Sequence, residues 1–149
     1  MRRIGPAVMA CALVALSATA LAASGRQHHV TDHLIGAQFQ KQGKTSTYAF
    51  EVHASDAGTG AAYTVDTSTS STGGTTHGVA YFASGSVRTA GTYRIGAARS
   101  NGVISVTFTG RDTGGTGAFK GIHGTYRGTG TDNTKTNVAT LTLKGTDTY

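Results

Sequence analysis

Beyond residue 22 the chain contains no cysteine, methionine or proline, because the single Cys, the single Pro and both Met residues all precede that point. Without cysteine no disulfide can staple the remaining chain. Without proline no strand edge is blocked by a residue that cannot donate a backbone hydrogen bond. The remaining part, roughly 125 residues, is long enough to bury its own core. It must therefore fold by side-chain packing and backbone hydrogen bonds alone.

Clustered positive charge is also missing. Beyond Arg2 and Arg3 the chain has eleven Lys and Arg against seven acidic residues, a net charge of +4 with His neutral. The bases are scattered, and no basic helix is available to enter a nucleic-acid groove. We therefore expect no nucleic-acid partner, and at most a mild attraction to anionic surfaces. The scattered bases include Arg88, Arg94, Arg99, Arg111, Lys120, Arg127, Lys135 and Lys144.

The first 22 residues have the pattern of a secretory signal peptide. Arg2 and Arg3 precede an apolar run from 6 to 15, and Ala20-Leu21-Ala22 matches an A-x-A cleavage site. The alternative, a membrane anchor, needs about 20 apolar residues, whereas Ser17 and Thr19 interrupt this run. The sequence therefore predicts a secreted, extracellular protein with no membrane span.

From Thr45 onward, apolar residues recur with period two, in short segments separated by Gly, Ser, Thr and Asp. The clearest is 46–54, where Tyr48, Phe50 and Val52 form an apolar face. No amphipathic helix of useful length is present. Seven or eight strands at spacings of about ten residues predict an all-β fold, a small antiparallel closed β-barrel of about eight strands, with a β-sandwich as the alternative. Further strands are expected at 61–67 (apolar face Tyr63 and Val65), 78–83, from 87, 91–97, 102–109 and 137–144.

The expected domain organisation has three parts: a signal peptide at 1–22, a flexible segment at 23–44, and the barrel at 45–149. The flexible segment holds His28, His29 and His33 in a solvated tail, followed by a candidate first strand near 34–40. Residues 66–76, DTSTSSTGGTT, have almost no apolar side chains. They are expected to form a flexible loop at the barrel rim.

Residues 114–131, GGTGAFKGIHGTYRGTGT, are rich in glycine yet contain Phe119, Ile122 and Tyr126. The spacing matches neither the phosphate-binding G-x-x-x-x-G-K-[ST] loop nor the dinucleotide-binding G-x-G-x-x-G turn. A calcium nonapeptide would need a carboxylate where Phe119 stands. The remaining interpretation is structural: a bent strand entering a barrel, with the first glycines in a turn or bulge and the later ones allowing close strand approach.

This segment resembles the GGTG-aromatic-x-G-x-x-G-x-aromatic segment of allene oxide cyclase-like barrels, which are related in fold to plant dirigent proteins. The match extends over residues 102 to 145. The resemblance implies an eight-stranded antiparallel barrel with a central cavity, in which some members fold a reactive substrate for cyclisation or orient coupling radicals. The matched glycines and aromatics are framework positions, so activity follows only by analogy of fold.

Motifs of other enzymes are sparse. There is no G-x-S-x-G elbow and no thiol nucleophile beyond residue 22, and no spacing pairs Glu51 with an Asp as a glycosidase would. Whether the protein is an enzyme stays open, and we expect neither a metal nor a cofactor. The candidate ligand-binding residues are Tyr126, His123 and Arg127, directed into the barrel mouth. An outer, solvated position is the alternative for His123 and Arg127.

Three functions fit these observations. The first is binding of an apolar or aromatic small molecule in a cavity lined by Tyr and Phe with few polar groups. The second is a cyclase-like or dirigent-like enzyme that orients a reactive substrate. The third is a filled barrel that acts as an extracellular surface or matrix interaction module. A hollow interior would separate the first two from the third, and the sequence does not determine the oligomeric state.

Overall fold

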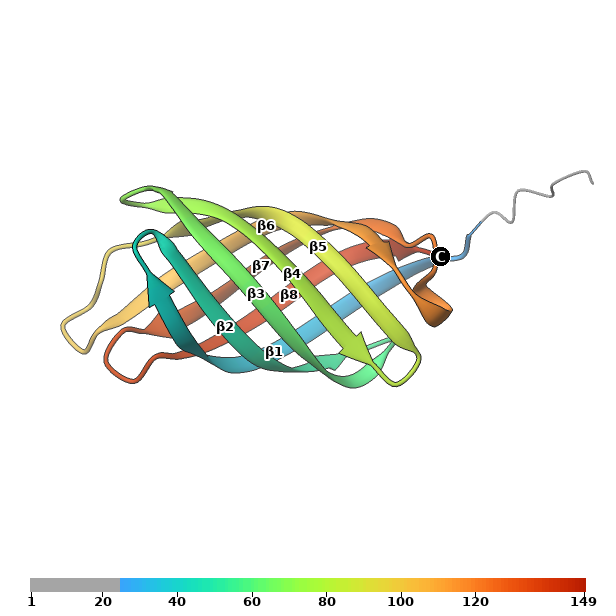
Figure 1. Ribbon diagram of the computed structural model, residues 1–149, viewed down its shortest axis with the longest axis horizontal. Coiled ribbons are helices and arrows are strands. Elements are labelled where there is room, and N and C mark those ends of the chain that lie inside the picture. Colours follow the sequence, from blue (N-terminus) through green and yellow to red (C-terminus); the bar gives the residue numbers. More distant parts are fainter. Residues whose placement is uncertain (1–24) are drawn as a thin grey trace, which may run out of the picture.

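The computed structural model describes residues 25–149, which form a closed antiparallel β-barrel of eight strands (Figure 1). Each strand pairs with the next along the chain, and β8 closes the barrel on β1. This confirms the predicted barrel and excludes the sandwich. The strands are β1 (Gln27–Gln42), β2 (Thr45–Ala54), β3 (Gly58–Ser70), β4 (Gly73–Phe82), β5 (Gly85–Ile95), β6 (Val103–Gly115), β7 (His123–Asn133) and β8 (Val138–Thr148).

The up-and-down order gives the barrel two distinct ends (Figure 1). We call the end that holds the start of β1 and the end of β8 the terminal end; Gln27 pairs there with Thr148. The β2–β3, β4–β5 and β6–β7 connections also lie at this end. The opposite, hairpin end holds the other four connections. Every strand therefore has a neighbour on both sides, so the described barrel has no free edge.

Alternation along the strands places one set of side chains inside. In β2, Phe50 and Val52 are 6% and 2% exposed, while Glu51 and His53, which alternate with them, point to solvent. The buried cluster continues across β1, β3 and β8 through Leu34, Ala62 and Leu141. The core is thus the inner lining of the wall, built from alternate residues as the period-two pattern predicted.

The glycine-rich stretch is divided into three pieces. β6 ends at Gly115, a 3₁₀ turn spans Gly117–Phe119, and β7 begins only at His123. Gly114 and Gly117 have φ of 144° and 61°, which confirms that the first glycines permit backbone turns that other residues rarely adopt. Phe119 and Ile122 are buried in this connection, not in a strand. Phe119 and Ile122 belong to a small second core at the terminal end.

This second core closes part of the terminal end. Phe119 is 3% exposed, and its ring centroid lies 5.7 Å from that of Phe82 and 5.3 Å from that of Tyr149. Val87 and Ile122 complete the buried group. Aromatic rings at these separations favour tilted and edge-to-face contacts. The connection between β6 and β7 is thus an apolar plug anchored on β4, β5 and the C-terminal residue.

Two expected segments differ from the structure. β1 begins at Gln27, so His28, His29 and His33 belong to a 16-residue strand and not to a solvated tail. The expected loop at 66–76 is wrong, because β3 continues to Ser70 and β4 begins at Gly73. Both segments lack an apolar alternation, and their strand structure comes from pairing with neighbours on both sides. The predicted signal peptide lies outside the described residues.

No helix among residues 25–149 is long and apolar enough to cross a membrane.

Candidate ligand cavity

The barrel encloses a cavity of about 160 Å³. Side chains of all eight strands and of the plug line it, and its middle section is apolar, with Leu34, Phe50, Phe108 and Leu143 among the contributors. Apolar cavities of about this volume can hold a molecule the size of benzene. The barrel interior is therefore hollow enough for a small ligand, in contrast to a barrel filled by its own side chains.

The cavity contains far more acid than expected. Every aspartate of the chain lines it: Asp32, Asp56, Asp66, Asp112, Asp132 and Asp147. The expectation of few polar groups is therefore wrong. The one glutamate, Glu51, lies on the outer face, 57% exposed. No Lys, Arg or His of residues 25–149 lines the cavity. The cavity lining of the described residues thus carries acidic side chains and no basic ones.

Three of these carboxyl groups have a hydroxyl partner. Tyr48 donates to Asp132 over 3.0 Å, and Tyr149 donates to Asp56 over 2.8 Å. Asp66 is hydrogen-bonded by Thr76, a side chain that is only 6% exposed. A buried carboxyl group that accepts a hydrogen bond recovers part of the solvation it loses. Asp66 and Asp132 are consequently built into the wall, whereas Asp56 lies in the exposed turn between β2 and β3.

The other three are Asp32, Asp112 and Asp147. Asp112 and Asp147 are hydrogen-bonded to each other, and the nearby His28 favours the charged form of Asp147. One oxygen each of Asp32, Asp66 and Asp112 is fully enclosed without a hydrogen bond. Asp112 and Asp147 lie against each other above Gly124, where a Cβ would overlap Asp147 Oδ1 and approach Asp112 Oδ2 to 2.8 Å. We call these three residues the aspartate cluster, since β1, β6 and β8 bring them towards the terminal end of the barrel.

Burial and mutual repulsion raise the pKa values of these acids. Desolvation, with smaller contributions from Asp56 and Asp147, raises the pKa of Asp32 from 3.8 to about 7. Desolvation also raises the pKa of Asp112, although a hydrogen bond with Asp147 acts against it. Desolvation together with the Asp112 carboxyl raises the pKa of Asp147 to about 7. Asp66 has a pKa of about 6, mainly because of burial. These groups can therefore exchange protons near neutral pH.

The predicted ligand-binding residues separate across the wall. Tyr126 points inward and lines the cavity; its ring lies over Gly110, where a Cβ would overlap it. Burial raises the pKa of its hydroxyl. His123 and Arg127 alternate with Tyr126 on β7 and are exposed on the outer face, with His123 Nδ1 3.2 Å from the carbonyl oxygen of Gly121. They are therefore not part of the cavity.

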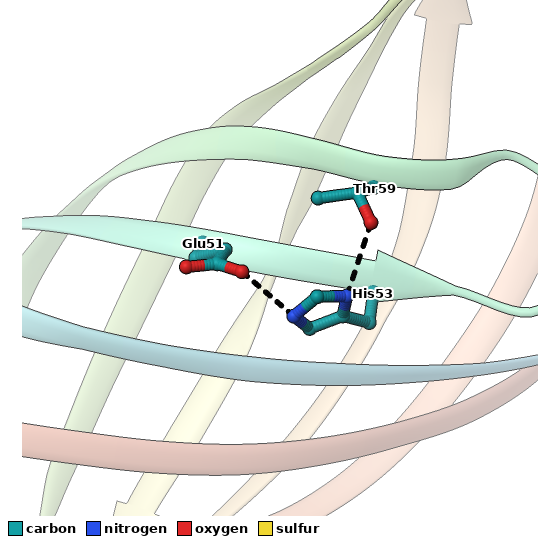
Figure 2. A network of polar contacts seen from close by, with 3 residues as sticks. All are labelled: Glu51, His53 and Thr59. Atoms are coloured by element: carbon teal, nitrogen blue, oxygen red, sulfur yellow. Dashed lines mark hydrogen bonds and ion pairs between the residues drawn. The ribbon is translucent and has the colours of Figure 1, made fainter.

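The outer wall carries its own small polar network (Figure 2). His53 Nε2 lies 2.8 Å from Glu51 Oε1, and His53 Nδ1 lies 3.1 Å from Thr59 Oγ1. The side chains of Glu51 and His53 are more than half exposed. This network has no access to the cavity because the sheet separates them. It is a surface contact and not a catalytic arrangement.

The inward aspartates were missed because Asp is typical of turns. A signal was nevertheless present in the phase of the strands. Asp32 lies two residues from Leu34, Asp112 four from Phe108, and Asp147 four from Leu143, so each shares the face of an apolar residue. In β3 the phase itself was misassigned. Tyr63 is 44% exposed, and Ala62, Thr64 and Asp66 point inward instead.

Within the described barrel, no group of three or more His, Cys, Asp or Glu side chains is arranged to hold a metal ion. No protein-family model matches the chain, and no curated protein and no solved structure matches it either.

Proposed function

We propose that this protein is a secreted barrel that binds a small apolar or aromatic molecule in its cavity. The observation that carries the proposal is the enclosed space of about 160 Å³ between apolar and aromatic side chains. Burial of apolar ligand surface there is favourable by about 25 cal/mol per Å². A molecule of roughly one aromatic ring matches the available volume, and the cavity argues against a purely structural interaction module.

The test is a titration of the labelled protein with toluene, followed by amide and methyl chemical shifts. Shifts confined to cavity residues such as Phe50 and Phe108 are expected. The variant Ala80→Leu, which fills part of the cavity, should weaken binding at least tenfold. Its control, Ala61→Leu, changes an outward residue on the adjacent strand and should leave binding unchanged. Shifts that are absent, or that Ala80→Leu leaves unaltered, would contradict cavity binding.

A second use of the same cavity is supported by the resemblance to allene oxide cyclase-like and dirigent-like barrels. Such a barrel would hold a reactive substrate in one conformation while it cyclises or couples. Asp32, with a pKa of about 7 inside an apolar cavity, is suited to move a proton during such a step. Native mass spectrometry of protein from its source, compared with the denatured sample, would identify the bound molecule. Conversion of that molecule by the protein would favour the enzyme over the carrier.

The same spectra test secretion. Cleavage after the A-x-A pattern at Ala20-Leu21-Ala22 would give a mature chain that starts near residue 23. A mature chain that still starts at Met1 would overturn the extracellular assignment.

A further inference from the structure

We infer that the barrel's ligand carries a basic nitrogen on its apolar body and places that nitrogen against Asp32, Asp112 and Asp147. The inference rests on the proposed binding function and names the chemical class of the ligand. It is carried by three features of the described residues: the cavity with its apolar middle section, the lining that holds acidic but no basic side chains, and the meeting of Asp112 and Asp147 at one end.

The separation of charge sets the sign of the ligand. All six aspartates line the cavity, and none of the eleven Lys and Arg of residues 25–149 does. An anionic ligand would therefore meet acidic side chains and no Lys or Arg in the lining, at a cost that increases as the dielectric falls. A cationic ligand supplies the opposite charge that no Lys or Arg of the lining provides.

The grouping of the acids sets the position. Asp112 and Asp147 are hydrogen-bonded to each other, and Asp32 lies within electrostatic range of both. Asp32 and Asp112 each keep one enclosed oxygen without a hydrogen bond; Asp66 keeps one as well, but the hydroxyl of Thr76 also bonds its carboxyl group. An ammonium group has three donors and no acceptor, which suits a site made of carboxyl acceptors. Its apolar body would extend into the middle of the barrel.

Gly124 lets Asp112 and Asp147 meet at this position. It lies opposite Asp147 on the paired strand β7, and any side chain there would overlap the carboxyl oxygens. The buried cluster of Val87, Phe119 and Ile122 packs at the same end of the barrel. A charge pair shielded from water is stronger than an exposed one.

Binding of an amine should release protons. In the empty barrel, burial keeps part of the carboxyl groups of the aspartate cluster protonated, and a bound ammonium would favour their charged form. The other titratable groups that face this position are Asp56, Tyr126, Tyr149 and His28. His28 is the backbone partner of Asp147 between β1 and β8, and its ring centroid lies 4.7 Å from that of Tyr149. Affinity for an amine should therefore rise between pH 6 and pH 8.

The test compares three compounds that share a phenyl ring on a two-carbon unit and differ in their polar group: 2-phenylethylamine, 2-phenylethanol and phenylacetate. Each is titrated calorimetrically into the full barrel at pH 8. We expect the amine to bind at least tenfold more tightly than the alcohol, and phenylacetate not to bind. At pH 7 the amine's apparent enthalpy should differ between phosphate and Tris because protons are released, whereas that of the alcohol should not.

The variants locate the contact. Asp112→Asn and Asp147→Asn should each remove most of the amine's tenfold advantage and leave alcohol binding unchanged. The matched control Glu51→Gln removes an acid from the outer wall and should change neither. Equal binding of amine and alcohol, or an advantage that survives Asp147→Asn, would overturn the inference and leave cavity binding intact. Failure of all three probes, together with toluene, would overturn the proposed function as well.

Discussion

The inner and outer faces of this barrel both carry aromatic and acidic residues, but these residues are buried on the inner face and exposed on the outer one. Inside, apolar residues and all six aspartates share a confined space. Outside, threonines, bases and a few aromatics face water, and Phe39 and Tyr81 are 59% and 57% exposed. The same ring or carboxyl group therefore has a large energetic effect on one face and a small one on the other. Burial, more than residue type, decides what each side chain does.

The largest difference between the faces should come from paired phenylalanine substitutions. Phe50→Ala removes a ring that is 6% exposed and leaves a cavity, so the free energy of unfolding should fall by about 3–5 kcal/mol. Phe39→Ala removes an outer ring whose only ring neighbour is Tyr63, at 5.9 Å, and should cost about 1 kcal/mol or less. Denaturant unfolding of both variants measures the difference; equal losses would contradict the assignment of the faces.

A smaller effect should come from acids on the two faces, through pH. The pKa of Asp32 is about 7 and that of Asp66 about 6 in the folded protein, while an unfolded Asp titrates near pH 3.9. The folded protein therefore binds more protons between these limits, and its free energy of unfolding should decrease as pH rises from about 4 to 7.

Variants locate this pH dependence. Asp32→Asn should be more stable than the parent at pH 8, similar to it at pH 4, and flatter between them. Glu51→Gln serves as the outer control and should keep the parent's slope. Denaturant unfolding at several pH values provides the measurement. A parent protein whose stability rises from pH 4 to 7 would show that the inward carboxyls are not desolvated.

The smallest effect should come from the surface network of Figure 2. The side chains of His53 and Glu51 are 54% and 57% exposed, and exposed ion pairs contribute about 0.2–1 kcal/mol. A double-mutant cycle with His53→Ala and Glu51→Gln should give a coupling energy within that range, and it should shrink in high salt because solvent ions screen the pair. A coupling of several kcal/mol would mean that this face is buried in an assembly.

Much of the fold could be predicted from residue patterns. The alternation of Tyr48, Phe50 and Val52 placed the right face of β2 inside, and Ala139, Leu141 and Leu143 did the same for β8. The prediction was wrong where apolar alternation was weak or misleading, as in β3, where Tyr63 points outward. Residues 66–76 are another such case, because neighbouring strands hydrogen-bond a polar segment into the ladder regardless of its side chains.

The candidate site was only partly foreseeable. Of the three predicted ligand-binding residues, Tyr126 lines the cavity, whereas His123 and Arg127 point outward by strict alternation along β7. Asp32, Asp112 and Asp147 were not foreseen as a group, since 35 to 80 residues separate successive members.

The chain by itself determined the all-β class, most of the strands and the glycine turn before β7, because period two and glycine backbone freedom are local properties. The structure then decided for the closed barrel over the sandwich. Only the tertiary structure decided which polar residues face inward and which of them meet. Closure of β8 on β1 places Asp147 opposite His28 and within electrostatic range of Asp32, and Gly124 on β7 leaves room for Asp112 and Asp147 to meet. The physical reason is that desolvation and charge interaction depend on distance in space, which strand register and barrel closure set together.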